Sequence, residues 1–439
     1  MTTRRGRDAI KTGGKMSSKK WLTAVIFPAL FFVNFARAEE PSAGSIRPDD
    51  SDSQRIVVFK KGVSMADARQ IAQQAGNKVV RDLELINAVV IRSPKVMIES
   101  VDARLFATGE VLRIDEDTHR TWINDAVAAP DFDDTVNAVI EKFTPMKAPA
   151  RPQPAGNELP WGIKKVKAPE AWPTTRGAKV KVAVVDTGID MDHPNLVANV
   201  KGGTNASMPI PVPVPTPPED DHGHGTHVSG TIAAAAIQAQ GSVIGVAPEA
   251  ELYAVKVLDG QGRGYLSGII SGIEWCVKNN MNVLNMSLGG PDDNQSFHDA
   301  ITAAYKAGVA IVAAAGNDSG GPVAYPAAYT ETIAVSASTL EDDFAYFSSK
   351  GPQVDFIAPG HKVYSTLKDG KYGTYSGTSM ACPHVTGLAA LAIARYGVRG
   401  TDAVREALRP AAAKLPKLTS DQQGNGLIDA YKLVTGSSL

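Results

Sequence analysis

The residue types around Ser379 are suited to serine chemistry. Ser376-Gly377-Thr378 forms a small turn before Ser379, and an apolar run typical of a buried helix follows at 388–396. A serine in the first turn of such a helix has an unpaired backbone N–H, and the helix dipole favours an oxyanion there. Pro383 is expected in the same first turn, where its missing N–H would have no partner. An ordinary N-capping Ser/Thr pair at the start of a core helix fits this stretch equally well.

Asp186 and His224 are the candidate partners of that serine. Asp186 ends an apolar strand, where a carboxylate is costly unless it is paired, although a turn-initiating aspartate is the alternative. His224 lies in His222-Gly223-His224-Gly225-Thr226-His227, a spacing that also invites a metal site. No carboxylate follows at a helical spacing, and the sequence contains no His-Glu-x-x-His motif. These absences weaken the metal interpretation. A metal-dependent hydrolase that uses the three histidines is kept as the hypothesis that competes with serine chemistry.

From residue 159 onward the sequence pattern predicts alternating strands and helices, and these elements must position the candidate side chains. Continuous apolar runs predict strands buried on both faces, which favours parallel strands joined by crossover helices. The ends of parallel strands form one edge, so Asp186, Ser287 and Asn317 are expected to share a crevice there. Asn317 follows a glycine and is typical of a turn, but its amide could also point at a reacting carbonyl oxygen. The predicted strands are 179–185, 252–258, 282–288, 309–315 and 332–338, with helices at 267–280 and 296–307.

A smaller module and a linker precede this alternating region. Strands at 55–60, 84–91 and 111–114, with helices at 65–74 and 96–106, predict a compact α+β unit. Five prolines and scattered apolar residues then predict an exposed, cleavable linker, with one short helix at 134–143. A second proline run at 208–218 predicts an extended surface spacer.

The extreme N-terminus has the pattern of a targeting segment. Lys19 and Lys20 precede an apolar run at 21–35, and Ala36-Arg37-Ala38 is a small-x-small cleavage site. The run is too short for a comfortable membrane span, so export without a permanent membrane anchor is expected. The expected location is secreted or periplasmic, with cleavage after Ala38.

Charge and cysteine usage exclude several classes. A formal net charge of −1 over 439 residues gives no reason to expect nucleic acid or an anionic membrane as a partner. Cys276 and Cys382 are the only cysteines, which excludes a disulfide framework and a four-cysteine metal site. Cys382 lies about one helical turn beyond Ser379 and is interpreted as a small buried residue, not a second nucleophile.

Three motifs resemble the signature motifs of the subtilisin-like serine proteases: Asp186-Thr187-Gly188, His224-Gly225-Thr226-His227 and Gly377-Thr378-Ser379-Met380-Ala381. Their order, Asp then His then Ser, is the subtilisin order among hydrolases. The resemblance covers about 157–439 and implies a three-layer α/β fold with a mainly parallel central sheet. The preceding module resembles the family's inhibitor-like propeptides, a small ferredoxin-like α+β domain. The implied divisions are 1–38 signal peptide, 39–122 propeptide domain, 123–156 Pro-rich linker and 157–439 catalytic domain.

The resemblance implies an endopeptidase made as an autoprocessed zymogen. Ser379 would attack the scissile carbonyl, His224 would transfer its proton, and Asp186 would orient the imidazole. Asn317 and the backbone N–H of Ser379 would form the oxyanion hole. Small, uncharged pocket walls imply broad specificity with a preference for apolar residues before the cut. The implied substrate-binding residues are Gly262, Arg263, Gly264, Ser287, Leu288, Gly289, Ala315, Gly316 and Ala324.

Cofactor and partner expectations also follow from the resemblance. Subtilisins commonly bind structural calcium, and Asn157, Asn195 and Gln238 are the candidate ligands here. Asn195 stands where many relatives have aspartate. The candidate ligands therefore carry little negative charge, which a hard cation prefers. No catalytic cofactor is expected. A monomer is expected, acting on protein or peptide substrates, with its own propeptide as intramolecular chaperone and inhibitor. A catalytically silent binding protein with the same fold is the second alternative.

Overall fold

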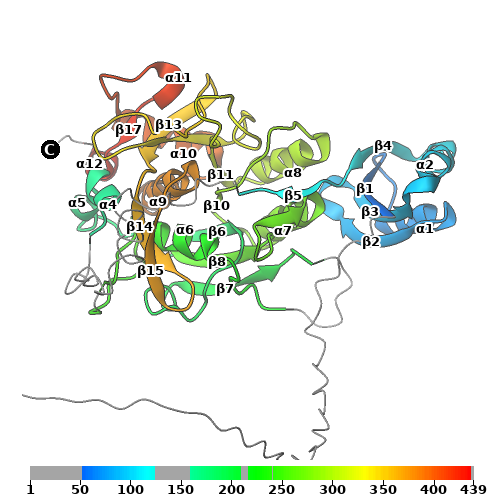
Figure 1. The fold of residues 1–439 in the computed structure, drawn as a ribbon, viewed down its shortest axis with the longest axis horizontal. Coiled ribbons are helices and arrows are strands. Elements are labelled where there is room, and N and C mark those ends of the chain that lie inside the picture. Colours follow the sequence, from blue (N-terminus) through cyan, green and yellow to red (C-terminus); the bar gives the residue numbers. More distant parts are fainter. Residues whose placement is uncertain (1–51, 124–158, 209–215, 240, 437–439) are drawn as a thin grey trace, which may run out of the picture. The chain divides into compact units, whose positions relative to one another are not determined.

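The computed structural model describes residues 52–123, 159–208, 216–239 and 241–436, shown in Figure 1. Several sequence-based predictions therefore lie outside the described residues: the signal peptide at 1–38, the linker at 123–156 apart from residue 123, its helix at 134–143, Asn157 and most of the proline run at 208–218. Within the described ranges, no helix is both long enough and apolar enough to cross a membrane.

The N-terminal module is a four-stranded antiparallel sheet covered by two helices on one face. The strand order β2-β3-β1-β4, with one helix after β1 and one after β3, confirms the expected α+β unit. The strand predicted at 84–91 combines a 3₁₀ turn at Glu84–Ile86 with the start of β3. No strand was predicted where β2 lies. The elements are β1 Asp52–Phe59, α1 Met65–Gln74, β2 Lys78–Leu83, β3 Ala88–Pro94, α2 Ile98–Ala107 and β4 Val111–Glu116.

Successive residues of β1 point to opposite faces of the module's sheet. Val57 and Phe59 pack with Leu105 of α2 in the module's own core. Ile56 and Val58 point to the opposite face and belong to the same apolar cluster as helices of the large domain. Among the described residues, it is the large domain that covers this second apolar face of the module.

The large domain is built on a nine-stranded sheet in the order β16-β17-β13-β12-β11-β10-β6-β8-β7. All of its pairs are parallel except β16 with β17, which confirms the mainly parallel sheet. The five predicted strands correspond to β6, β8, β10, β11 and β12. The bounds are β6 Lys181–Asp186, β7 Val200–Asn205, β8 Glu251–Lys256, β10 Val283–Met286, β11 Ala310–Ala314, β12 Ile333–Ser338, β13 Val354–Pro359, β16 Ala412–Ala413 and β17 Leu427–Ile428.

Helices cover both faces of this sheet and give three layers (Figure 1). Alternate residues of β6 and β11 pack with α6 His224–Ala233 and α9 Thr378–Tyr396 on one face. The intervening residues pack with α7 Leu266–Lys278 and α8 Gln295–Lys306 on the other face. Smaller elements complete the described fold: β5 His119–Thr121, α4 Trp161–Lys165, α5 Ala168–Ala171, β9 Arg263–Tyr265, β14 Val363–Leu367, β15 Lys371–Tyr375, α10 Thr401–Leu408, α11 Ser420–Gln423 and α12 Ala430–Thr435.

The strand order reverses between β6 and β10: β7 and β8 lie on one side of β6, and the chain then crosses to β10 on the other side. In an open parallel sheet, a crevice forms at such a switch point, beyond the carboxyl ends of the strands. Asp186 ends β6, and Ser287 follows the end of β10. The fold therefore brings these two predicted residues to the same edge of the sheet, at the switch point.

Candidate active site

Asp186 and His224 form a buried, hydrogen-bonded pair at the carboxyl end of β6. The Nδ1 atom of His224 lies 2.7 Å from Oδ1 of Asp186. The Asp186 side chain is fully buried, and that of His224 is 1% exposed. Oδ1 of Asp186 also accepts the backbone N–H of Thr187 at 2.7 Å. The pairing compensates for the cost of burying a carboxylate and fixes the orientation of the ring.

His224 is the first residue of α6, so the start of that helix sets its position. A Cβ atom on the next residue, Gly225, would lie 2.1 Å from the carbonyl oxygen of Gly188, so only glycine allows this approach. The backbone N–H of Gly225 donates to Thr187 Oγ1 at 3.0 Å. These contacts hold the beginning of α6 against the turn that follows Asp186.

A second buried carboxylate, Asp220, caps the same helix. Its Oδ1 accepts from Gly223 N and Thr187 Oγ1, and its Oδ2 accepts from the backbone N–H and the hydroxyl of Thr226, at 2.6–2.9 Å. Burial alone would raise the pKa of Asp220, but these hydrogen bonds together hold the pKa below its usual value. Asp220 was not among the residues predicted from the sequence. An aspartate four residues before the helix was the signal, and it could have been interpreted as a cap.

Ser379 lies in the first turn of α9, as predicted, and its side chain reaches the end of β10. Its hydroxyl donates to the carbonyl oxygen of Ser287 at 3.2 Å. The prediction for Pro383 was wrong, because α9 begins at Thr378 and Pro383 is its sixth residue. A proline there removes the N–H that the carbonyl of Ser379, four residues earlier, would accept in a regular helix.

Asn317 is held by the same helix start. Its Oδ1 accepts the backbone N–H of Thr378 at 2.9 Å and the Thr378 hydroxyl at 3.0 Å. The Thr378 hydroxyl oxygen in turn accepts the N–H of Gly316 at 3.1 Å. Because Oδ1 faces α9, the amide NH₂ of Asn317 occupies the other side of the carboxamide.

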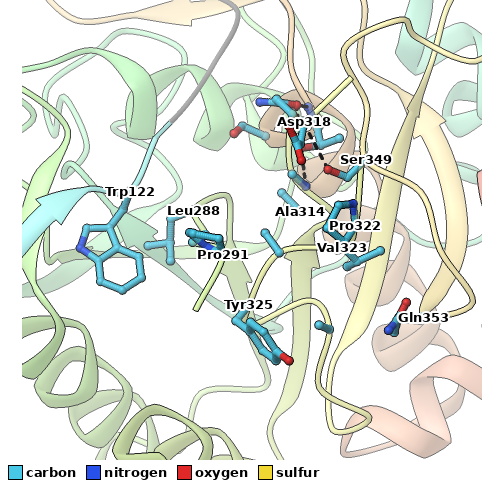
Figure 2. A pocket seen from close by; sticks show the side chains of 18 residues that line it. Trp122, Leu288, Pro291, Ala314, Asp318, Pro322, Val323, Tyr325, Ser349 and Gln353 are labelled. Atoms are coloured by element: carbon cyan, nitrogen blue, oxygen red, sulfur yellow. Dashed lines mark hydrogen bonds between the residues drawn. The ribbon is translucent and has the colours of Figure 1, made fainter. Parts of the chain in front are cut away.

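Asn317 and Ser379 both line a cleft of about 520 Å³. Figure 2 shows Trp122 at one end of this pocket and Gln353 at the other, with Tyr325 between them. Of the predicted substrate-binding residues, four line the cleft, whereas Ala315 is fully buried in the core. The lining residues are Trp122, Leu288, Gly289, Gly290, Pro291, Ala314, Gly316, Asn317, Asp318, Pro322, Val323, Ala324, Tyr325, Ala328, Ser349, Gln353, Thr378 and Ser379.

The chain's own segment 119–122 lies along the predicted substrate-flanking strands. β5 pairs antiparallel with β9, so that Arg120 lies opposite Gly264 and Thr121 opposite Arg263. Beyond that pair, Trp122 N–H donates to Gly262 O at 3.0 Å. On its other side, the Trp122 carbonyl accepts the N–H of Gly289 at 2.9 Å. This role of Trp122 was not predicted from the sequence, although an aromatic residue stands at the end of the module.

Buried polar contacts tie the module to the large domain. Arg81 donates to the carbonyl oxygens of Ala206 at 3.0 Å and Met208 at 2.5 Å. Asp117 accepts the backbone N–H and the hydroxyl of Ser267, near the start of α7, at 2.8 and 2.7 Å. Burial lowers the pKa of Arg81 and raises the pKa of Asp117. Both side chains are therefore buried against the large domain while the module is in place.

The three histidines of the motif do different things. His224 pairs with Asp186, whereas Nε2 of His227 lies 3.0 Å from the carbonyl oxygen of Val363, and its ring stacks on Tyr375. His222 lies beside His224 with ring centroids 6.2 Å apart. Among the residues that the structure describes, no group of three or more His, Cys, Asp or Glu side chains could hold a metal ion.

The calcium candidate Asn195 makes contacts that a calcium ligand could not make. Its Nδ2 donates to the carbonyl oxygens of Ala235 at 2.6 Å and Val243 at 3.0 Å, and the side chain is fully buried. Its Oδ1 accepts the hydroxyl of Tyr372 at 2.6 Å. A cation here would need the carbonyl oxygens of Ala235 and Val243 as ligands. Both oxygens already accept hydrogen bonds from the Asn195 amide nitrogen. Gln238 is exposed and Asn157 lies outside the described residues, so the contacts of Asn195 are the observation that does not fit a strong calcium site.

Comparisons with known proteins give the family that the sequence motifs resemble, along most of the chain. Residues 177–426 match the model of the subtilase family. The chain is 36% identical to subtilisin E of Bacillus subtilis (strain 168) over 422 residues, covering 94% of this chain and 98% of that protein. It is 46% identical to a subtilisin of Bacillus pumilus over 276 residues, 62% of this chain and 97% of the relative. It is also 45% identical to the major intracellular serine protease of Bacillus subtilis over 242 residues, 54% of this chain and 75% of that protein.

Proposed function

Because the chain belongs to the subtilase family and is a serine protease of the subtilisin type, we propose that Asp186, His224 and Ser379 are its catalytic triad. The observation that carries this proposal is the buried contact of 2.7 Å between His224 Nδ1 and Asp186 Oδ1. With Nδ1–H directed at the carboxylate, Nε2 is the basic nitrogen of the ring.

The mechanism is acyl transfer in two steps. As Ser379 Oγ attacks the scissile carbonyl carbon, His224 takes the hydroxyl proton and then gives it to the leaving amine. The result is an acyl-enzyme ester and a free amine. Water, deprotonated by His224, attacks the ester and releases the carboxylic acid and Ser379. Asp186 stays ionised and stabilises the imidazolium that forms in each step.

Asn317 is proposed as the oxyanion donor, together with the backbone N–H of Ser379. Its Oδ1 is fixed by Thr378, which directs its NH₂ away from α9. Such a preorganised donor stabilises the tetrahedral intermediate without reorganisation. For a subtilisin itself, losing this amide is known to cost about 10²–10³ in kcat.

Broad specificity with a preference for apolar residues before the cut is also proposed. Ala314, Gly316 and Ala324 leave space in the cleft, and Val323 and Tyr325 give it apolar walls. A medium or large apolar side chain can fill such a space and displace water from its walls.

The chain is further proposed to be an exported zymogen whose module is an intramolecular chaperone and inhibitor. Residues 119–122 lie along both substrate-flanking segments, and Trp122 closes one end of the cleft, so a substrate cannot bind there at the same time. Cleavage in the linker that follows would release this strand. The lysines and apolar run before Ala38 support export to the periplasm or the medium, and we expect the mature enzyme to be a monomer.

Expression of Ser379→Ala beside the wild type tests the triad and the autoprocessing together. We expect the wild type to lose the module, whereas Ser379→Ala keeps it and hydrolyses peptides at background rate. Ser376→Ala is the matched control, because its hydroxyl lies in the same turn but accepts only the N–H of Lys362 in the described contacts. Loss of the module from Ser379→Ala in the same host would show that Ser379 does not carry out the processing.

A further inference from the structure

The carbonyl group of Ser379 lacks the partner that a regular helix would give it. In α9, this carbonyl should accept the N–H of residue 383, which is a proline and has none. An unpaired carbonyl in a buried helix is costly, and it would leave the first turn of α9 free to shift. The Ser287 hydroxyl supplies the missing donor, at 2.9 Å from the carbonyl oxygen of Ser379.

The Ser287 hydroxyl is itself oriented by Asn285, which lies in β10. Nδ2 of Asn285 donates to Ser287 Oγ at 2.9 Å. A hydroxyl has one proton, so a hydroxyl that accepts from Asn285 has its proton available for the Ser379 carbonyl. The direction of this hydrogen bond therefore depends on the NH₂ side of the Asn285 amide facing Ser287.

Two side chains of α9 hold the amide in that orientation. Oδ1 of Asn285 lies 3.3 Å from Cys382 Sγ and 2.8 Å from Thr386 Oγ1, both of which can donate to it. Burial raises the pKa of Cys382 to about 12, so the thiol keeps the proton that it donates. Asn285, Ser287, Cys382 and Thr386 are all fully buried, and water does not compete for these bonds.

The same end of β10 also contacts the reactive atom. The hydroxyl of Ser379 donates to the backbone carbonyl of Ser287 at 3.2 Å. Ser287 is thus bonded to both the side chain and the carbonyl of Ser379. A rotation of the first turn of α9 would disturb the two contacts together.

We propose that Asn285 is a positioning residue, which acts through Ser287 to replace the helix hydrogen bond removed by Pro383 and so fixes the turn that carries Ser379. The proposal rests on the proposed function, in which Ser379 is the nucleophile. Cys382 and Thr386 set the direction of this chain of hydrogen bonds. Without Asn285, the Ser287 hydroxyl is free to turn away, and the nucleophile samples unproductive positions.

A double-mutant cycle with Pro383→Ala tests this proposal on the mature enzyme. In the wild-type background, Asn285→Ala should lower kcat by about tenfold with KM changed by less than about twofold, the size expected for one buried hydrogen bond. Pro383→Ala restores an N–H to the helix, which can bond the Ser379 carbonyl directly. In that background, we expect Asn285→Ala to lower kcat by only about twofold.

Ser287→Ala repeats the cycle with a smaller change, in case Asn285→Ala does not fold. It should show the same loss of kcat and the same rescue by Pro383→Ala. Asn199→Ala is the matched control, because its amide donates to two backbone carbonyls, Ala233 and Pro248, elsewhere in the domain. It should lower the unfolding midpoint and leave kcat unchanged.

An equal loss of kcat in the Pro383 and Pro383→Ala backgrounds would overturn the proposal. So would a loss confined to the unfolding midpoint or to KM. The proposed function is tested separately by labelling the mature wild-type enzyme with a peptidyl phosphonate: an adduct on Ser379 upholds the nucleophile whatever the cycle shows, whereas inactivation without that adduct would overturn both proposals.

Discussion

His224 Nδ1 lies 2.7 Å from Asp186 Oδ1, and the contact is sealed from solvent on the α6 side of the sheet. The carboxylate comes from the last residue of β6, and the ring comes from the first residue of α6. Two chain segments separated by 38 residues thus meet at the strand switch point, which is where an open parallel sheet concentrates function.

Asp186→Asn should reduce kcat by about 10⁴, a loss of the size known for triads, including that of a subtilisin. An amide of the same shape can present its N–H to Nδ1 and favour the wrong ring tautomer. The unfolding midpoint should change little by comparison. Hydrolysis of a chromogenic peptide with phenylalanine before the cut measures the effect, with the exposed Asp369→Asn as control. A loss below tenfold would contradict the assigned role.

Asp220→Asn should destabilise the protein at neutral pH by about 1–3 kcal/mol, because half of the acceptor sites that cap α6 are lost. The folded protein holds the pKa of Asp220 below its unfolded value, so the stabilising contribution is present above that unfolded value. It is lost as the pH falls through the lower, folded pKa.

Urea unfolding at several pH values checks this dependence. The difference in unfolding free energy between wild type and Asp220→Asn should shrink below about pH 4. Asp343→Asn, an exposed aspartate that contacts Lys417, serves as control. A difference that stays constant down to pH 2 would show that the Asp220 charge does not stabilise α6.

Removal of the Arg81 guanidinium should loosen the N-terminal module. In the Ser379→Ala background, which is expected to retain the module, Arg81→Met leaves the carbonyls of Ala206 and Met208 without this donor. The backbone N–H of Trp122, bonded to Gly262, should then exchange with solvent at least about tenfold faster. Arg69→Met is the control, since Arg69 pairs with Asp82 inside the module. Unchanged exchange would mean that Arg81 does not help to seat the strand.

Chelation should leave the stability of the mature enzyme nearly unchanged. The Asn195 amide joins the carbonyls of Ala235 and Val243 without an ion. We expect excess EDTA to shift the unfolding midpoint by less than about 2 °C, because no bound ion is lost. Asn195→Ala, by contrast, should cost about 2–3 kcal/mol by leaving buried polar groups unpaired. A midpoint that falls by about 10 °C in EDTA and recovers with Ca²⁺ would contradict the account.

The sequence predicted the fold best where the pattern is local. The continuous apolar runs identified β6, β8, β10, β11 and β12 within one or two residues, because central parallel strands are buried on both faces. β2 escaped detection, since Lys78, Arg81 and Asp82 interrupt its apolar pattern. Arg81 is nevertheless buried, for its partners lie on the large domain.

The site residues were predictable by type, but their contacts were not. Asp186, His224, Asn317 and Ser379 stand out in the sequence; in the structure Asp186 pairs with His224, and Asn317 and Ser379 line one cleft. The roles of Asp220, Asn285 and Trp122 depend on partners far along the chain, which no periodicity indicates. Pro383 was misplaced because its neighbours do not reveal where α9 begins.

Mass spectrometry of the mature enzyme treated with a peptidyl phosphonate tests the central claim most directly. A phosphonate bonds covalently to an activated serine, so the account predicts one adduct, on the peptide that contains Ser379, formed in step with the loss of activity. Denatured enzyme should form none. An adduct on another residue, or complete inactivation without any adduct on Ser379, would contradict the claim that Ser379 is the nucleophile.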